Sequence, residues 1–209
     1  MKPIGYYNYT VVATYLGLAA AGIGCFFAME EMMKAALICL MIAGATDMVD
    51  GKIASTRKRT AEEKRFGIQI DSLCDLVSFG VLPVMVLNCF TVPETAKKIV
   101  GILFILAAVI RLAYFNVTEE IRQTKTEGRR EYYEGLPVTS GALLLPAVCL
   151  LDPLLRSREY AMGVIYLLAL ALIGILFLMP FRLKKPGRKG IAAMTAVGTL
   201  VFLSVIFVI

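Results

Sequence analysis

Long apolar runs alternate with short polar stretches along the whole chain. Most of these runs reach about 20 residues, the length that a helix needs to cross the hydrocarbon core of a bilayer. The pattern therefore predicts seven helical segments, at roughly 7–28, 35–54, 67–90, 97–117, 136–151, 160–181 and 191–209.

The fifth segment is shorter than the others and contains Pro137 and Pro146. Proline removes a backbone donor and disturbs a helix interior. Three alternatives follow for this segment: a broken helix, a re-entrant helix, or a full span extended by Leu154 and Leu155.

Composition supports a membrane protein. Hydrophobic residues make up 58% of the 209 residues, and the mean hydropathy is +0.74. We therefore expect an all-α, polytopic membrane bundle with six to seven transmembrane segments, formed by a single domain over residues 1–209. No early segment pairs a short apolar core with a small-residue cleavage site, so the first segment is expected to be a retained span. The five cysteines lie in apolar segments without a Cys-x-x-Cys pair, which favours core packing over disulfides or zinc.

Positive charge is concentrated in alternate loops: after the second, fourth and sixth segments, and beside the N-terminus. By the positive-inside rule, these loops and the N-terminus are predicted to face the cytoplasm, with the C-terminus outside. The net charge of +6 is thus explained by topology and anionic headgroups, and no nucleic-acid partner is expected.

Four carboxylates stand at the inner ends of the second and third segments, where a charge is costly. On helices, the spacing of three and of four residues directs each pair to one face of its helix. One aspartate alone would be an ordinary boundary charge, but two facing pairs repel strongly without a cation between them. The chain has no histidine, so oxygen ligands and Mg²⁺, Mn²⁺ or Ca²⁺ are indicated. The predicted ligands are Asp47, Asp50, Asp71 and Asp75, with the small residues Gly51, Ala54 and Gly67 beside them.

Other polar residues lie near the same surface. Arg111 and Asn116 are predicted to line the inner half of the fourth segment, although Arg111 could equally snorkel or pair with a structural carboxylate. Gly135 marks a sharp entry into the fifth segment. Asn8 and Thr10 open the first segment, where capping a helix is their default role.

The acidic stretch resembles the signature of the CDP-alcohol phosphotransferase family, Asp-x-x-Asp-Gly-x-x-Ala followed by Gly-x-x-x-Asp-x-x-x-Asp. Arg111-Leu-Ala-Tyr-Phe-Asn116-Val and Gly135-Leu-Pro resemble the branch that makes phosphatidylserine. The sequence departs from the family pattern at Ser55, where the family has an arginine, and Arg57 is the candidate replacement.

The resemblance implies two divalent ions, Mg²⁺ or Mn²⁺, on the aspartates, with Asp75 also the catalytic base. It implies a CDP-diacylglycerol site formed by Gly51, Ala54, Arg57 and Gly67, with Asn8 or Thr10 reading cytosine. The acceptor would be L-serine, bound by Arg111, Asn116, Gly135 or an arginine of the 122–130 loop, and the protein would be a homodimer among membrane lipids. The alternatives are the same chemistry with glycerol 3-phosphate or an inositol phosphate, a divalent-cation transporter, and a purely structural membrane protein.

Overall fold

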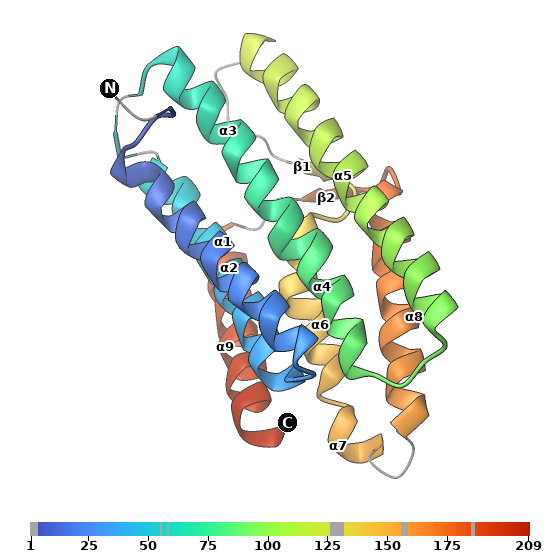
Figure 1. Ribbon diagram of the computed structural model, residues 1–209. Helices are drawn as coiled ribbons and strands as arrows, with labels where there is room; N and C mark the ends of the chain where they lie inside the picture. The colour runs from blue at the N-terminus through green and yellow to red at the C-terminus, as the bar shows by residue number, and fades with distance from the viewer. Residues whose placement is uncertain (1–3, 55, 58, 126–131, 156–158, 185–186) are drawn as a thin grey trace.

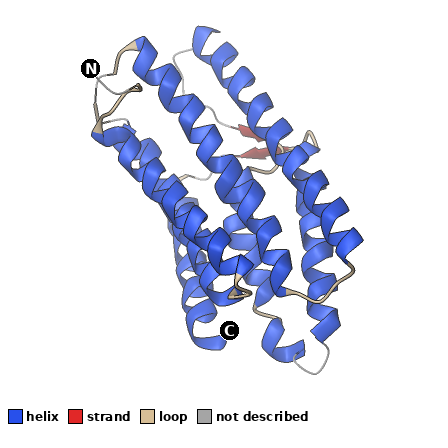
Figure 2. Ribbon diagram, viewed as in Figure 1, coloured by secondary structure: helices blue, strands red, loops and turns tan. Residues whose placement is uncertain are grey.

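Each apolar segment predicted from the sequence is helical in the computed structural model, which describes residues 4–54, 56–57, 59–125, 132–155, 159–184 and 187–209. The long helices are α1 (Val12–Met29), α2 (Met33–Ala54), α3 (Ala61–Asp75), α5 (Glu94–Lys125), α8 (Glu159–Leu178) and α9 (Arg188–Val208). The shorter ones are η1 (Tyr9–Val11), η2 (Leu76–Val81), α4 (Leu82–Met85), η3 (Val86–Cys89), η4 (Val138–Ser140), α6 (Gly141–Cys149) and α7 (Asp152–Leu155). The predicted all-α bundle is confirmed (Figures 1 and 2).

Six helical stretches in the described part of the chain are long and apolar enough to cross a membrane. They are Tyr9–Met29, Ala61–Cys89, Glu94–Arg122, Val138–Leu155, Tyr160–Leu178 and Lys189–Val208. The fifth predicted segment is thus extended, because α6 and α7 together with η4 reach 18 residues. α2 is also long enough, with 22 residues, but it is not one of these six because it contains Asp47, Asp50 and two lysines.

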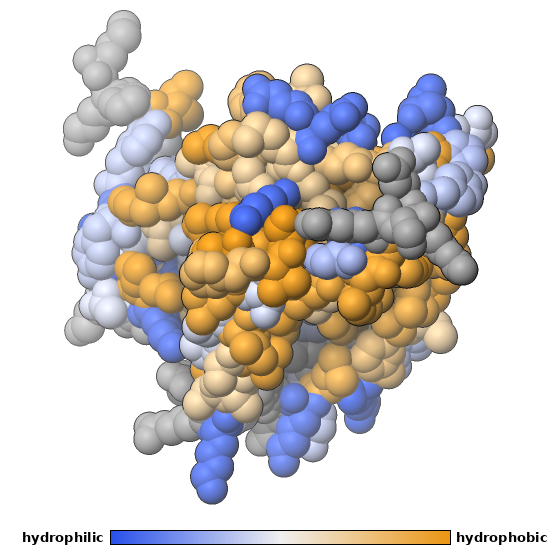
Figure 3. Space-filling view, turned by 90° about the horizontal axis from the view of Figure 1, so that it is seen from below, coloured by the Kyte–Doolittle hydropathy of each residue, from blue (hydrophilic) through white to orange (hydrophobic). Residues whose placement is uncertain are grey.

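The outside of the bundle is hydrophobic. Leu168, Leu172 and Ile175 on α8 are more than half exposed, as are Leu200 and Phe207 on α9. The end that carries α7 and the C-terminus is also largely hydrophobic, with separate groups of hydrophilic side chains (Figure 3). Such a surface is suited to lipid and confirms an integral membrane protein.

α1 and α2 lie side by side, in the most extensive contact between two elements of the fold (Figure 1). The buried residues of α1 are all small and recur every three or four positions: Ala13, Gly17, Ala21, Gly24 and Ala28. Small residues at this spacing let two helix backbones approach closely. This packing fixes how far α1 stands from the aspartates of α2.

The stretch Ala61–Cys89 is helical throughout but changes its winding. It begins with a capping box in which Thr60 and Glu63 bond to each other's backbone amides. η2 is a π-helix, and α4, which follows it directly, has Pro83 as its second residue. Proline cannot donate to the carbonyl four residues earlier, so a wider turn here accommodates it. Tyr166 of α8 donates to the Pro83 carbonyl at 2.9 Å, a buried bond that ties this stretch to α8.

One small sheet was not predicted. Strand β1 (Tyr132–Glu134) pairs antiparallel with β2 (Arg182–Lys184), with Tyr133 opposite Leu183. The pairing joins the connection before α6 to the connection after α8 (Figure 2). All five cysteines are free; Cys39, Cys74 and Cys149 are buried, and Cys25 and Cys89 are half-buried.

Candidate active site

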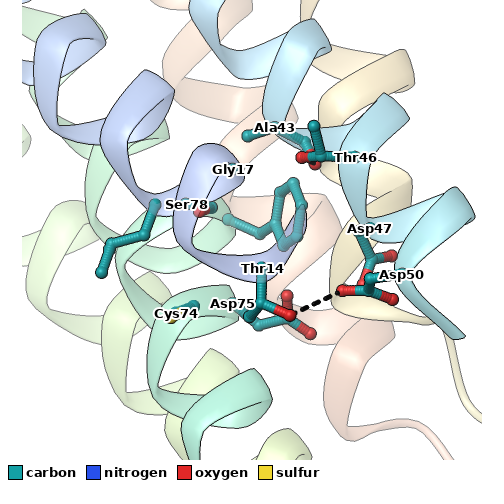
Figure 4. A pocket seen from close by; sticks show the side chains of 11 residues that line it. Thr14, Gly17, Ala43, Thr46, Asp47, Asp50, Cys74, Asp75 and Ser78 are labelled. Atoms are coloured by element: carbon teal, nitrogen blue, oxygen red, sulfur yellow. Dashed lines mark hydrogen bonds between the residues drawn. The ribbon is translucent and has the colours of Figure 1, made fainter. Parts of the chain in front are cut away.

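Three aspartates converge where α2 and α3 face each other. Asp47 of α2 and Asp71 and Asp75 of α3 each offer a carboxylate oxygen, and these oxygens lie within 4.8 Å of one another. Figure 4 shows Asp47 and Asp50 facing Asp75 across the gap between their helices. Ionised carboxylates this close repel one another, and a divalent cation removes that repulsion. An all-oxygen set of this kind fits Mg²⁺ or Mn²⁺.

Asp50 belongs to the same acidic group but has different surroundings. Its side chain is only 9% exposed, and its Oδ2 accepts a hydrogen bond from the Thr14 hydroxyl of α1 at 3.2 Å. It also lies within hydrogen-bonding reach of Asp71. The structure thus brings together all four predicted aspartates.

A small pocket opens beside these carboxylates (Figure 4). Its lining combines the acidic residues with hydroxyl groups and a phenyl ring from three helical stretches. They are Thr14, Gly17 and Leu18 of α1; Ala43, Thr46, Asp47 and Asp50 of α2; and Cys74, Asp75, Ser78 and Phe79 of α3 and η2.

Thr14, Thr46 and Ser78 were missed by the sequence interpretation. Each is a hydroxyl-bearing residue within an apolar run, and Thr46 directly precedes Asp47. This signal was available, but such residues also occur in membrane helices that only pack. Their contribution to this pocket depends on contacts between helices.

The small residues of the signature flank the acidic group without lining the pocket. Gly51 directly follows Asp50 in α2 and is exposed, with open space where a side chain would begin. Gly67 lies one turn before Asp71, and a Cβ there would stand 3.1 Å from Arg59 Nη1. Ala54 is the last residue of α2 and is half-buried.

The predicted nucleotide contacts Asn8, Thr10 and Arg57 are bound to protein groups. Asn8 Oδ1 accepts bonds from the Thr10 amide, at 2.9 Å, and from the Thr10 hydroxyl. Asn8 Nδ2 donates to Glu63 at 3.4 Å, and Arg57 pairs with Glu63 at 3.6 Å. Asn8 therefore caps the first turn, as the simpler alternative predicted. Ser55 lies outside the described residues.

The predicted acceptor residues divide between two places. Arg111 is buried, and its Nε donates to the Leu136 carbonyl at 3.1 Å, next to Gly135. Asn116 accepts a bond from Ser72 at 3.0 Å and so lies next to the acidic helix. Neither Arg111 nor Gly135 lines the acidic pocket.

The loop from 122 to 130, which was expected to supply a cation, is only partly described. Arg122 binds Glu119 one turn earlier, with Nη2 to Oε1 at 2.5 Å. Arg129 and Arg130 lie outside the described residues.

The sequence matches the family model described as CDP-alcohol phosphatidyltransferase over residues 8–202. The chain belongs to this family. The match includes the whole acidic group and accounts for the aspartate signature. A divalent metal is expected of this family, and the oxygens of Asp47, Asp71 and Asp75 are grouped closely enough to hold one.

Curated relatives of the family share moderate identity with the chain. A CDP-diacylglycerol–serine O-phosphatidyltransferase of Mycobacterium leprae is 34% identical over 131 residues, covering 62% of this chain and 42% of the relative. That of Saccharomyces cerevisiae is 35% identical over 108 residues, covering 51% and 38%. That of Helicobacter pylori J99 is 28% identical over 203 residues, covering 96% and 80%.

The match thus spans less than half the length of the first two relatives. No solved structure gives a significant match to the chain.

Proposed function

We propose that this protein transfers the phosphatidyl group of CDP-diacylglycerol to the hydroxyl of L-serine, giving phosphatidylserine and CMP in phospholipid biosynthesis. The observation that carries the proposal is the convergence of Asp47, Asp71 and Asp75 within a chain of the CDP-alcohol phosphatidyltransferase family. Serine as the acceptor is supported by the names of the relatives compared above.

Asp47, Asp50 and Asp71, together with Asp75, are the residues that would hold the divalent ions. Bound there, the ions would neutralise the diphosphate and favour departure of CMP. The carboxylates come from two helices of the bundle, so their separation is set by helix packing and not by a loop. A rigid site of this kind favours the alignment that an in-line displacement needs.

Asp75 is the proposed general base. It lines the pocket at the last position of α3, where an acceptor hydroxyl could approach it. The serine oxygen forms a bond to the phosphorus that carries diacylglycerol, the bond from that phosphorus to CMP breaks, and the hydroxyl proton moves to the Asp75 carboxylate.

The remaining roles follow from position. Gly51, Ala54 and Gly67 would leave room for the nucleotide along α2 and α3. Arg57, Asn8 and Thr10 would contact it at the same end of the bundle, after giving up part of their contacts with Glu63 and with each other. Arg111, Asn116 and Gly135 are the proposed acceptor side.

Orientation and assembly are part of the same proposal. The acidic end is proposed to face the cytoplasm; the positive-inside rule supports this side, because Arg59, Lys64 and Arg65 lie at that end. The chain is expected to act as one domain and as a homodimer, as the family resemblance implies. Light scattering of the detergent-solubilised protein measures whether it is a homodimer.

The test is CMP release from CDP-diacylglycerol by the purified protein in detergent with Mg²⁺ or Mn²⁺. L-Serine, glycerol 3-phosphate and inositol phosphate are compared as acceptors, with EDTA as the metal-free control. Release that requires serine and metal supports the proposal. Release with another acceptor overturns serine but keeps the chemistry, and no release from folded protein with any acceptor overturns the activity.

A further inference from the structure

The Thr14 hydroxyl crosses from α1 to α2 to reach an acidic residue. It donates to Asp50 Oδ2 at 3.2 Å. Thr14 is half-buried and lines the pocket beside Asp47 and Asp75. A residue of a third helix thus contacts the acidic group, which otherwise comes from α2 and α3 alone.

This contact differs from those of four other threonines in the described helices. The hydroxyls of Thr46, Thr118, Thr195 and Thr199 each donate to a carbonyl three or four residues earlier in their own helix. Such internal bonding is the ordinary choice for threonine in a helix. Thr14 directs its hydroxyl to a neighbouring helix, so its bond contributes to the acidic group.

The bond restricts the carboxylate of Asp50. Asp50 lies at the margin of the cluster formed by Asp47, Asp71 and Asp75, and rotation about its side-chain bonds would turn its oxygens away from that cluster. A donor on Oδ2 restricts this rotation. Groups that orient ligands in this way tune metal sites although they never touch the metal.

The approach of α1 makes the bond possible. Gly17 lies one turn after Thr14, and a Cβ at Gly17 would come 2.6 Å from Thr46 Oγ1. At Gly17, α1 and α2 are therefore so close that only a glycine fits. This close approach lies one turn from the Thr14–Asp50 contact.

We infer that Thr14 is a positioning residue that orients Asp50 for divalent-metal binding; the inference rests on the proposed function of the aspartates as metal ligands. Thr14→Val keeps the shape of the side chain but removes the hydroxyl, Thr14→Ala removes it in a smaller side chain, and Thr14→Ser retains it. Thr195→Val makes the same change on α9, which contributes nothing to the pocket lining.

The experiment measures Mn²⁺ binding to the purified protein in detergent, without substrate, from the electron paramagnetic resonance signal of free Mn²⁺. Thr14→Val and Thr14→Ala are expected to weaken Mn²⁺ binding about 10- to 100-fold, the usual effect of losing an outer-shell partner. Thr14→Ser and Thr195→Val are expected to bind as the unmodified protein does. If Thr14→Val fails to fold, the Ala and Ser variants carry the comparison.

Unchanged Mn²⁺ affinity in a folded Val or Ala variant would overturn the inference while leaving the proposed function in place. Equal weakening in Thr14→Ser would also overturn it, because the hydroxyl would then not be the group that matters. Absence of Mn²⁺ binding by the unmodified protein would instead overturn the proposed metal site, and the inference with it.

Discussion

Asp47 and Asp75 bring carboxylate oxygens within 4.8 Å of each other from two different helices. Asp47 lies near the end of α2, and Asp75 is the last residue of α3 before the π-helical turn η2. Asp71, one turn before Asp75, completes the cluster. Asp71 and Asp75 are four residues apart and therefore share one face of α3. Asp75 lies next to the pocket's hydroxyl groups, and Asp71 lies beside Asp50.

Replacing Asp75 by asparagine should lower turnover about 100- to 10,000-fold, because general-base catalysis contributes about that much. Asparagine keeps the shape but accepts no proton. The measurement is CMP release at saturating serine and metal. Asp152→Asn is the matched control, since Asp152 belongs to α7, at the end of the bundle away from the start of α3 (Figure 1). Near-normal turnover in Asp75→Asn would remove its role as base.

Removal of the metal should abolish CMP release, and Mn²⁺ added back should restore it. Asp47→Asn should raise the Mn²⁺ concentration needed for half-maximal release at least about tenfold, since even groups outside the ligand set change affinity by about 10- to 100-fold. Titration of Mn²⁺ into EDTA-treated protein measures both effects. An unchanged Mn²⁺ requirement in Asp47→Asn would exclude Asp47 as a ligand.

Gly17→Ala should separate α1 from α2, because its Cβ would stand 2.6 Å from Thr46 Oγ1. Overpacking of this kind costs about 1–3 kcal/mol. Heating in detergent with a thiol-reactive dye measures the loss, since Cys39, Cys74 and Cys149 are buried until the bundle opens.

Gly22→Ala on the same helix is the matched control, because its Cβ meets nothing within 4 Å. In Gly17→Ala with Thr46→Ala, the clashing oxygen is gone, so part of the lost stability should return. A Gly17→Ala variant as stable as the Gly22→Ala variant would contradict the close approach of the two helices.

Hydropathy located the helices well but not their polar extensions. The third segment was expected to begin at residue 67 and begins at Ala61, because the capping box of Thr60 and Glu63 supports a polar first turn. The fourth segment likewise continues past 117 to Lys125. Among the described side chains, neither extension contains a fully buried residue, and both are mostly polar, so apolar runs alone could not reveal them.

The candidate site, too, could be predicted from the sequence only in part. The aspartates were predictable because carboxylates at helical spacing in an apolar chain require an explanation. The Thr14–Asp50 bond and the position of Ser78 in the pocket were not, because they depend on how α1 crosses α2 and on the π-turn after Asp75. The β1–β2 pair was missed because its strands have three residues each, too few for an alternating pattern.

The Gly135→Ala variant tests the connection between β1 and η4, where Arg111 donates a hydrogen bond to the Leu136 carbonyl. Gly135 has φ of +76°, and a Cβ there would stand 2.8 Å from the Met179 carbonyl oxygen. Its amide donates to the Phe181 carbonyl at 2.6 Å, and the next residue, Leu136, accepts from Arg111. The Cβ of an alanine would clash with a backbone atom, which cannot move away by rotating as a side chain can. The strained φ adds about 1–3 kcal/mol to the loss of folding free energy.

The expected result is a lower unfolding temperature together with a higher KM for serine, because the displaced carbonyl of Leu136 would release the Arg111 guanidinium from its position. Gly198→Ala on α9 is the matched control, since its Cβ meets nothing within 4 Å and alanine favours a helix. Steady-state kinetics with serine and, separately, CDP-diacylglycerol varied distinguish the two substrates. A folded Gly135→Ala variant with unchanged KM for serine would show that this connection lies apart from acceptor binding and would reduce Arg111 to a structural role.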